Sequence, residues 1–493
     1  MLPIKLSRAN LSSLVPTVAT PTYDVENISA GIVHLGFGGF HRAHMARYTH
    51  DLMGSTRDHG DWGIVGVGLL DGDRHMRDAL LPQDCLYTLV ERTATQDTAS
   101  VIGSVCGVLH AQDNRAQLFD ALDDARVRIV SLTVTENGYC MDRASGALDV
   151  DNPAIRHDIA SPTEPVSAPG IIVQAAKRRM LARQPGFTAL SCDNVQHNGH
   201  VLAGSVLALA RLSSPDVVAW VEDNIHFPGT MVDRITPVTT SDDLLILRDE
   251  FGVDDAWPVF CESFRQWVIE DDFIRGRPAW EHVGAQFVKD VAPYEFMKLR
   301  LLNASHLAVA GLGQLSGYEF MAEAMADKKI SAFMRALMDR ETGQTLRPVP
   351  GIDLTLYKKT LIERFSNPKI RDTTQRVNTD APLATLLDSA RDRLKDDQSI
   401  DLLALAIAAW IKRVAGENDH GQPLDIRHPL AAPLRDKARE GRRDPGPVIG
   451  IRPLFGNLAD DTRFVAPVSR WLERLYDLGT QGTLERALAE GSF

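Results

Sequence analysis

The sequence predicts an α/β fold, a doubly wound parallel sheet followed by a mostly α-helical domain. In the first half of the chain, short β-branched runs alternate with helical patterns, which is typical of parallel sheets with crossover helices. After about residue 290 the strand pattern fades, and apolar residues recur at three- and four-residue spacing. We therefore expect an α/β domain over residues 1–290 and a mostly helical domain over residues 291–493.

Length and composition agree with a globular protein of two domains. A chain of 493 residues is too long for a single hydrophobic core, and its 44% hydrophobic and 24% charged residues are ordinary for such proteins. The formal net charge of −12 argues against a nucleic acid or an anionic membrane surface as a partner, because both need basic patches.

Cysteine usage and the N-terminal sequence favour a cytoplasmic location. The five cysteines are scattered and form no Cys-x-x-Cys pair, so we expect neither a disulfide framework nor a structural zinc site. The N-terminus lacks the apolar run of a signal peptide. The longest uncharged stretch, residues 301–318, contains too many polar residues and glycines for a membrane span.

Four apolar runs in the first half are the expected strands, and each ends in small or polar residues. The runs are Ile32–Leu35, Trp62–Leu70, Arg128–Thr135 and Phe187–Ser191. Open α/β sheets bind ligands at the carboxyl ends of their strands. We therefore expect the residues that follow these runs to form a binding site.

The turn after the first strand is a candidate phosphate-binding loop of the Rossmann type. Glycines allow a tight turn and a close approach of the backbone to a pyrophosphate group. The match to the G-x-G-x-x-G pattern is imperfect, because its third glycine falls at His41. The candidate cofactor-binding residues of this turn are Gly36, Phe37, Gly38, Gly39 and Phe40.

An acidic turn follows the second strand. Asp71 or Asp73 is placed to accept hydrogen bonds from the adenosine ribose and to repel a 2′-phosphate, which predicts NAD as the cofactor. The neighbouring Arg74 favours a 2′-phosphate, so NADP stays open. The pair His41 and His44 has no third ligand nearby, and we assign no metal.

In the second half of the chain, the segment Pro293–His306 is the one richest in side chains that can transfer protons or donate hydrogen bonds. As an α-helix at about 100° per residue it places Glu295, Lys298, Asn303 and His306 within about 140° of one another. A solvated helix face is the simpler interpretation. The apolar continuation Leu307–Gly313 argues against it and favours polar groups that face a cleft.

Seven motifs stand in one order along nearly the whole chain. They resemble the polyol-specific long-chain dehydrogenase family, also called the mannitol dehydrogenase family. The motifs are Gly36–His44 (GFGGFHRAH), Thr133–Tyr139 (TVTENGY), Ser191–Asn194 (SCDN), Met231–Pro237 (MVDRITP), Phe264–Asp271 (FRQWVIED), Lys298-x₄-Asn303-x₂-His306 and Glu363–Asn367 (ERFSN).

The resemblance implies a zinc-independent NAD(P) oxidoreductase that acts on acyclic sugar alcohols or sugar acids. It makes residues 1–290 a dinucleotide-binding domain and residues 291–493 a substrate-binding domain. It implies Lys298 as the general base, with Glu295 beside it on a proton route, and Asn194 and Asn303 as the amides that hold the reacting oxygen. Further residues carried over from the motifs are His306, Asp233 and Arg376 for the substrate, and Glu136 and Asn137 for the cofactor.

The substrate stays open at this point. We expect an acyclic polyol of the D-mannitol type and its 2-ketose of the D-fructose type, handled by a monomer or weak homo-oligomer. The alternatives are reduction of a keto-sugar acid such as D-fructuronate, oxidation of D-arabinitol, and a non-catalytic NAD-binding sensor. A Ser-Lys-x-Pro element that family members usually carry shortly after the residue equivalent to Arg376 is missing here, which bears on substrate preference.

Overall fold

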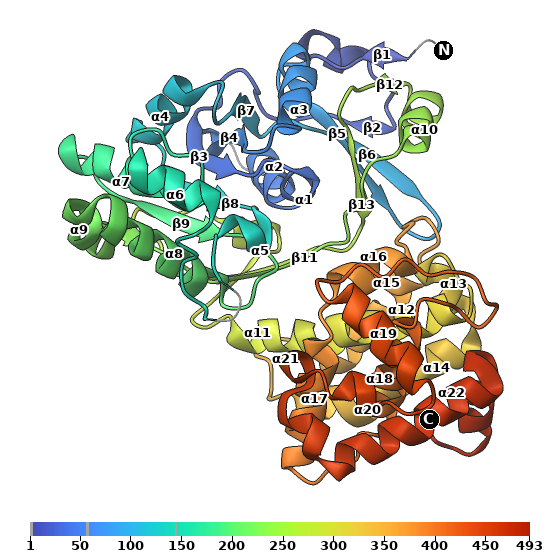
Figure 1. Cartoon of the computed structure of the whole chain (residues 1–493). Coiled ribbons are helices and arrows are strands. Elements are labelled where there is room, and N and C mark those ends of the chain that lie inside the picture. The colour runs from blue at the N-terminus through green and yellow to red at the C-terminus, as the bar shows by residue number, and fades with distance from the viewer. Residues whose placement is uncertain (1–2, 56–58, 143–144) are drawn as a thin grey trace. The chain divides into compact units, whose positions relative to one another are not determined.

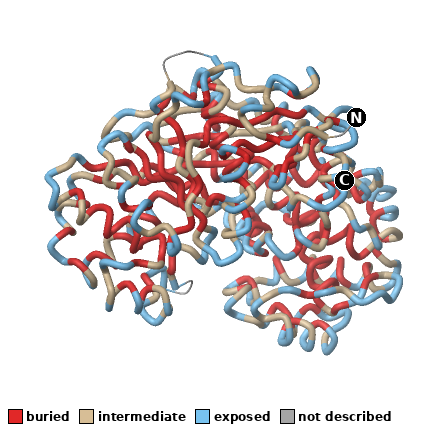
Figure 2. Tube along the Cα trace, turned by 90° about the horizontal axis from the view of Figure 1, so that it is seen from above, coloured by how far each residue is buried: buried red, intermediate tan, exposed pale blue. Residues whose placement is uncertain are grey.

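The chain forms two compact units, Met1–Ala292 and Pro293–Phe493 (Figure 1). The computed structural model describes residues 3–55, 59–142 and 145–493. In both units the buried residues, red in Figure 2, run through the interior strands and helices, and exposed residues lie around them. Each unit is described by itself below.

A six-stranded sheet forms the centre of the first unit. Its strand order is β10-β9-β8-β3-β4-β7, and all neighbouring strands are parallel. The strands are β3 (Ala30–Leu35), β4 (Gly63–Gly68), β7 (Val105–His110), β8 (Ile129–Leu132), β9 (Phe187–Ser191) and β10 (Ile225–His226). The four predicted strands are confirmed as β3, β4, β8 and β9. The order reverses between β3 and β8, which is where doubly wound sheets bind ligands.

Both faces of this sheet are covered, which explains why its strands are nearly continuous apolar runs. Successive side chains of a strand point to opposite faces. Accordingly, Val130 packs in one core with Ile171 of α7 (Ala168–Leu181) and Leu202 of α8 (Asn198–Ser213). Its neighbour Ile129 packs in another core with Met45 of α2 (Met45–Ser55).

Smaller sheets complete the first unit. A four-stranded sheet has the order β13-β5-β6-β2, a three-stranded sheet has the order β11-β14-β15, and β1 pairs with β12. Their strands are β1 (Ile4–Lys5), β2 (Val18–Ala19), β5 (Tyr87–Arg92), β6 (Asp97–Ile102), β11 (Thr230–Asp233), β12 (Val253–Asp254), β13 (Val259–Glu262), β14 (Gln266–Glu270) and β15 (Gln286–Val288).

The second unit is helical, as predicted. Two helices, α12 (Ala304–Leu315), buried over its whole length, and α18 (Asp401–Arg413), buried from Leu402 onward, pack against each other at its centre. The long helix α22 (Thr462–Ala489) packs along α18 and kinks at Gly479, whose φ is 67°. The helices α13 (Met321–Ala326) and α16 (Thr374–Asp380) pack against α12.

The prediction of one regular α-helix over residues 293–306 was wrong. The chain runs from α11 (Ala292–Met297) into a π-helical turn, Lys298–Asn303, before α12 begins. A π-turn closes its hydrogen bonds over five residues instead of four, so it is wider than an α-helical turn. The angles calculated for Glu295, Lys298, Asn303 and His306 with the α-helical period therefore do not hold. Such turns occur frequently at functional sites.

None of the helices within the described ranges is both long and apolar enough to cross a membrane.

A buried glutamate caps the central helix α18. Glu341 ends a second π-helical turn, Leu337–Glu341, and its carboxylate accepts hydrogen bonds from the backbone N–H groups of Leu402 (2.9 Å) and Leu403 (2.7 Å). Burial raises the pKa of Glu341 to about 7, above its ordinary value of 4.5. The stability of the helical unit is therefore coupled to pH at this residue.

Between pH 4.5 and 7 the folded state binds more protons at Glu341 than the unfolded state, so this group's contribution to stability is lost as the pH rises. The shift corresponds to roughly 3 kcal/mol. We predict that the free energy of unfolding of the wild type, relative to Glu341→Gln, falls by about this amount from pH 4 to pH 8 in urea titrations. The exposed change Glu440→Gln controls for the loss of one carboxylate. A difference between wild type and Glu341→Gln that does not vary with pH contradicts the prediction.

Candidate active site

The glycine turn joins β3 to α1 (Gly39–Ala43) at the carboxyl end of the sheet. Gly36 has a φ of +87°, and a Cβ there would lie 2.1 Å from the carbonyl oxygen of Thr133, so this glycine is required by the fold itself. At Gly38 and Gly39 an added Cβ would meet no atom closer than 3.9 Å. Packing does not require glycine at these two positions, and the absence of side chains leaves the turn accessible to a bound phosphate group.

A buried histidine, His34, supports this turn through a chain of hydrogen bonds. The hydroxyl of Thr133 donates to the carbonyl oxygen of Gly36 (2.8 Å), so it accepts from Nε2–H of His34 (2.9 Å). Nδ1 of His34 is then unprotonated and accepts from the hydroxyl of Ser131 (2.8 Å). Burial lowers the pKa of His34 to about 3, which keeps the ring neutral. The conformation of the turn thus depends on hydrogen bonds from the end of β8 and from Thr133, the residue after it.

The aromatic residues of the turn face into the protein. Phe37 is buried, and its ring lies within 2.4 Å of the place that a Cβ on Gly66 would take. Phe40 stacks on His44, with ring centroids 5.0 Å apart. Both were among the predicted cofactor-binding residues. The side chain of Phe37 belongs to the core and that of Phe40 is partly buried against core residues, and the backbone N–H of Phe37 donates to the carbonyl oxygen of Val67 (3.2 Å).

The two histidines of the motif do not form a metal pair. His41 stacks on His34 with centroids 3.4 Å apart, and Nε2–H of His44 donates to the carbonyl oxygen of Gln266 (2.9 Å). Burial lowers the pKa of His44 to about 3. Within the described part of the chain, no three His, Cys, Asp or Glu residues are grouped as metal ligands would be.

The acidic turn after β4 has two carboxylates with different partners. Asp73 begins α3 (Asp73–Leu80) and accepts hydrogen bonds from the N–H groups of Leu69 (2.8 Å) and Leu70 (2.9 Å). The side chain of Asp71 is 92% exposed and pairs with Arg74 (2.5 Å). Arg74 is also paired with Asp113 (2.9 Å). Asp71 is therefore the more accessible carboxylate, and the charge of Arg74 is shared between two acids.

Asp193 joins the carboxyl ends of β8 and β9. Its carboxylate accepts hydrogen bonds from the N–H groups of Val134 (3.0 Å) and Thr135 (2.8 Å) and from the hydroxyl of Tyr139 (2.6 Å). Thr135 has a left-handed φ of 62°, which these bonds help to maintain. Burial raises the pKa of Asp193 despite the hydrogen bonds it accepts.

This network positions three of the predicted site residues. Glu136 and Asn137 are exposed on the short helix α5 (Thr135–Gly138), directly after the residues that Asp193 holds. Asn194, also exposed, is the next residue after Asp193. Asp233 lies elsewhere in the unit, buried at the end of β11 in the three-stranded sheet.

In the second unit the predicted residues lie on consecutive turns. Glu295 is on α11, Lys298 and Asn303 are the first and last residues of the π-turn, and His306 is in the first turn of α12. Glu295, Lys298 and His306 are buried, and Asn303 is partly exposed. A lysine, a carboxylate, an amide and an imidazole thus project from one continuous helical segment.

A carboxylate absent from the sequence prediction connects His306 to Arg376. Asp372 is buried and forms two 2.6 Å contacts with Arg376, to Nε and Nη2. Nε2 of His306 lies 3.3 Å from Oδ2 of Asp372. Asp380 pairs with the remaining terminal nitrogen of Arg376 at 3.1 Å. The i,i+4 spacing of Asp372 and Arg376 in the sequence would have indicated the pair, but nothing local to it points to His306.

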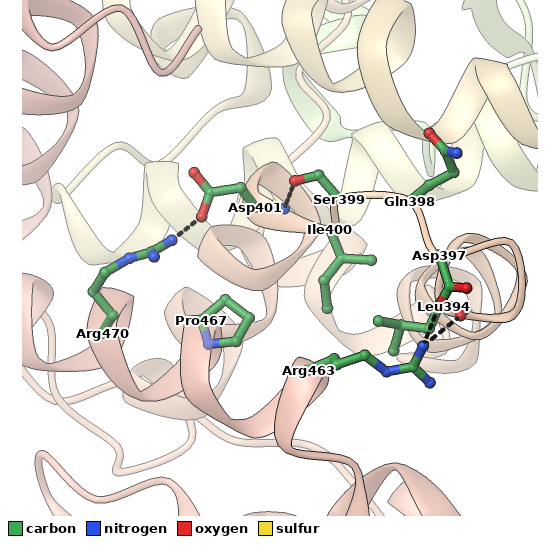
Figure 3. Close-up of a pocket in the computed structure, with 9 residues that line it drawn as sticks. All are labelled: Leu394, Asp397, Gln398, Ser399, Ile400, Asp401, Arg463, Pro467 and Arg470. Carbon is green, nitrogen blue, oxygen red and sulfur yellow. Dashed lines mark hydrogen bonds and ion pairs between the residues drawn. The ribbon is translucent and has the colours of Figure 1, made fainter.

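A separate cavity of about 500 Å³ lies in the helical unit, next to the starts of α18 and α22 (Figure 3). Its two arginines are already paired, Arg463 with Asp397 (2.6 Å) and Arg470 with Asp401. None of the predicted site residues lines it. We assign this cavity no part in the chemistry below.

Comparison with known proteins identifies the family. The sequence matches the mannitol dehydrogenase Rossmann domain over residues 30–282 and the mannitol dehydrogenase C-terminal domain over residues 290–476. The chain belongs to the mannitol dehydrogenase family. The resemblance predicted from the seven motifs is confirmed, and so is the prediction of an oxidoreductase.

Individual relatives match over nearly their full lengths. The chain is 42% identical to D-mannonate oxidoreductase of Escherichia coli, covering 94% of this chain and 97% of that protein. It is 39% identical to mannitol 2-dehydrogenase of Aspergillus fumigatus, covering 99% of both. Among solved structures, mannitol 2-dehydrogenase of Pseudomonas fluorescens in a ternary complex with NAD and D-mannitol is 42% identical. That structure gives a TM-score of 0.88 and covers 99% of this chain and 100% of that one.

Removing the hydrogen bonds that support the glycine turn should weaken the binding of NADH. Thr133→Val and His34→Phe each leave a buried polar group without its partner, at a cost of about 1–3 kcal/mol. We expect the turn to lose its conformation and the dissociation constant for NADH to rise about tenfold, measured by quenching of protein fluorescence.

Thr480→Val in the second unit is the matched control, because the buried hydroxyl of Thr480 has no hydrogen-bond partner among the described residues. An unchanged affinity for NADH in both Thr133→Val and His34→Phe would show that the turn does not depend on this network.

Proposed function

We propose that the protein is an NAD-dependent dehydrogenase that interconverts an acyclic polyol of the D-mannitol type and its 2-ketose. The observation that carries the proposal is the match, over 99% of the chain, to a mannitol 2-dehydrogenase that binds NAD and D-mannitol. Within the first unit lie the cofactor-binding residues together with Asn194 and Asp233, and within the second lie the base Lys298 and the substrate ligand His306.

The chemistry follows from the residue types. Lys298 takes the proton of the reacting hydroxyl, and Glu295 passes it onward. NAD, when bound, accepts the hydride. An amide, such as that of Asn194 or of Asn303, can donate a hydrogen bond to an oxygen on which negative charge develops, contributing roughly 3–4 kcal/mol if well placed. Amides do this without titrating, so proton transfer in each turnover is left to Lys298 and Glu295.

The first unit fits the dinucleotide. The open positions at Gly38 and Gly39 admit the pyrophosphate, and the loop with Glu136 and Asn137 lies at the next strand of the same sheet edge. Asp71 is the carboxylate for the adenosine ribose, since the Oδ2 atom of Asp73 is engaged by two backbone N–H groups. This arrangement supports NAD ahead of NADP.

A sugar acid is the second candidate substrate, favoured by the 42% identity to D-mannonate oxidoreductase. A substrate carboxylate would need a free cation. Arg376 is already paired with Asp372 and Asp380, and the lysine of the Ser-Lys-x-Pro element is missing. These observations favour an uncharged polyol over a sugar acid, and Asp233 and His306 as its hydroxyl ligands.

A substrate panel tests the proposal. D-mannitol, D-arabinitol and D-mannonate are assayed with NAD, and D-fructose and D-fructuronate with NADH, by absorbance of the reduced nicotinamide. The proposal predicts the highest kcat/KM for D-mannitol and D-fructose. A higher kcat/KM for the sugar acids would contradict the proposal and support the second candidate. NADH binding without turnover would instead support a non-catalytic sensor.

Replacing the base should abolish turnover and spare cofactor binding. We predict that Lys298→Ala lowers kcat by several orders of magnitude, because nothing else takes the hydroxyl proton, while the dissociation constant for NADH changes less than threefold. Lys359→Ala is the matched control, since its side chain is 70% exposed and pairs with Glu363 one turn away on α15 (Leu354–Phe365). Near-normal kcat in Lys298→Ala would contradict the assignment.

Cofactor preference should respond to Asp71. Asp71→Ala removes the repulsion of a 2′-phosphate and releases one partner of Arg74, so the ratio of kcat/KM for NADP to that for NAD should rise about tenfold. Asp78→Ala, which removes the exposed partner of Arg77 on the same helix, controls for net charge. An equal change in both variants would place the ribose away from Asp71.

A further inference from the structure

We propose that Asp372 is a positioning residue that holds His306 in the tautomer protonated at Nε2. His306 then offers Nδ1 as a hydrogen-bond acceptor, and the group it recognises is a substrate hydroxyl that donates a proton. The inference rests on the proposed function for the identity of the substrate, but its geometry lies wholly within the second unit.

Asp372 is a fixed, ionised carboxylate. Only 3% of its surface is exposed, and both of its oxygens contact the guanidinium of Arg376 at 2.6 Å. Burial alone would raise its pKa, but His306 and Arg376 hold the pKa of Asp372 well below its ordinary value. The carboxylate therefore stays negative at neutral pH.

His306 is held in place on two sides. Its ring stacks on Phe365, with centroids 4.3 Å apart and planes 18° apart. Its Nε2 atom lies 3.3 Å from Oδ2 of Asp372, an electrostatic contact outside hydrogen-bond geometry, and has no hydrogen-bond partner among the described residues. The stacking fixes the plane of the ring, and the carboxylate determines which nitrogen points to it.

These contacts decide the tautomer. If Nε2 were unprotonated, its lone pair would face a negative oxygen at 3.3 Å and the two would repel each other. With Nε2 protonated the contact is attractive. A neutral imidazole carries one N–H, so Nδ1 is the acceptor. This is the same arrangement in which carboxylates fix the histidine ligands of metal sites, used here for an organic substrate.

The consequence is a preference for a particular substrate chemistry. An unprotonated Nδ1 accepts a proton from a hydroxyl but repels a carboxylate, which has lone pairs only. A site that hydrogen-bonds a hydroxyl discriminates strongly against an analogue that lacks it, because its own polar group is then left unpaired. His306 and Asp372 together thus select for a polyhydroxylated chain.

The first test observes the tautomer directly. The wild-type protein is labelled with ¹⁵N-histidine, and the His306 resonances are assigned by their loss in His306→Gln. The proposal predicts a protonated Nε2 and an unprotonated Nδ1. In Asp372→Asn this pattern should change, whereas Asp380→Asn, which removes the other acidic partner of Arg376 without touching His306, should leave it as it is. A protonated Nδ1 in the neutral ring of the wild type overturns the proposal.

The second test separates positioning from a general loss of structure. Asp372→Asn should raise KM for the preferred polyol at least tenfold, with a smaller fall in kcat and an unchanged dissociation constant for NADH. Asp388→Asn, which breaks an exposed ion pair with Arg391, is the control and should change KM less than twofold. Equal effects on KM in the two variants contradict a positioning role.

A double-mutant cycle links the effect to His306. In the His306→Ala background, Asp372→Asn should raise KM less than threefold, because the group it positions is gone. A full tenfold rise there would mean that Asp372 acts only through Arg376 and overturns the proposal. If no polyol or ketose is turned over by the wild type, the proposed function fails, and the tautomer measurement still decides the role of Asp372.

Discussion

The carboxylate of Asp193 holds together the part of the first unit on which the proposed chemistry depends. Three donors from the end of β8 and the loop after it meet this one side chain at the end of β9. Parallel strands are fixed to each other by their own hydrogen bonds, but the loops beyond their ends are not. Asp193 thus helps to position the backbone just before Glu136 and Asn137, and Asn194 is the residue that follows it.

In the second unit, too, buried carboxylates hold several donor groups together. Asp372 gathers Arg376 and His306 from two helices, and Glu341 caps the helix α18 that packs behind α12. A buried carboxylate is costly to desolvate, and it is retained where several donors converge on it. In both units, buried acids therefore contact or adjoin the residues that we propose for the chemistry.

Much of the fold could be predicted because its causes are local. Strands buried on both faces, such as β8 and β9, require continuous apolar residues, and the glycine at position 36 follows from a backbone conformation that other residues avoid. The π-turn Lys298–Asn303 could not be predicted, because a shift of the hydrogen-bond pattern leaves no mark in composition. The inward direction of Phe37 was missed because it depends on the space left by Gly66 in the next strand.

The roles of Asp193 and Asp372 could not be predicted from the sequence either, for a related reason. Thr135 lies 58 residues from Asp193, and His306, on α12, is far from Asp372 in the chain, so only the topology brings these groups together. Lys298, Asn303 and His306 were selected by spacing within one segment and by resemblance to the family. The sequence motifs thus identified candidate catalytic and substrate-binding residues, and the structure identified the buried acids next to them.

The central claim, direct hydride transfer between a polyol carbon and NAD, can be tested by following one atom. The protein is incubated with NAD and D-mannitol carrying deuterium on the carbinol carbons C2 and C5, and the reduced cofactor is analysed by mass spectrometry. The account predicts one deuterium per molecule of reduced nicotinamide and a slower turnover than with unlabelled substrate. Reduced cofactor without deuterium, or deuterium released into water, would contradict it.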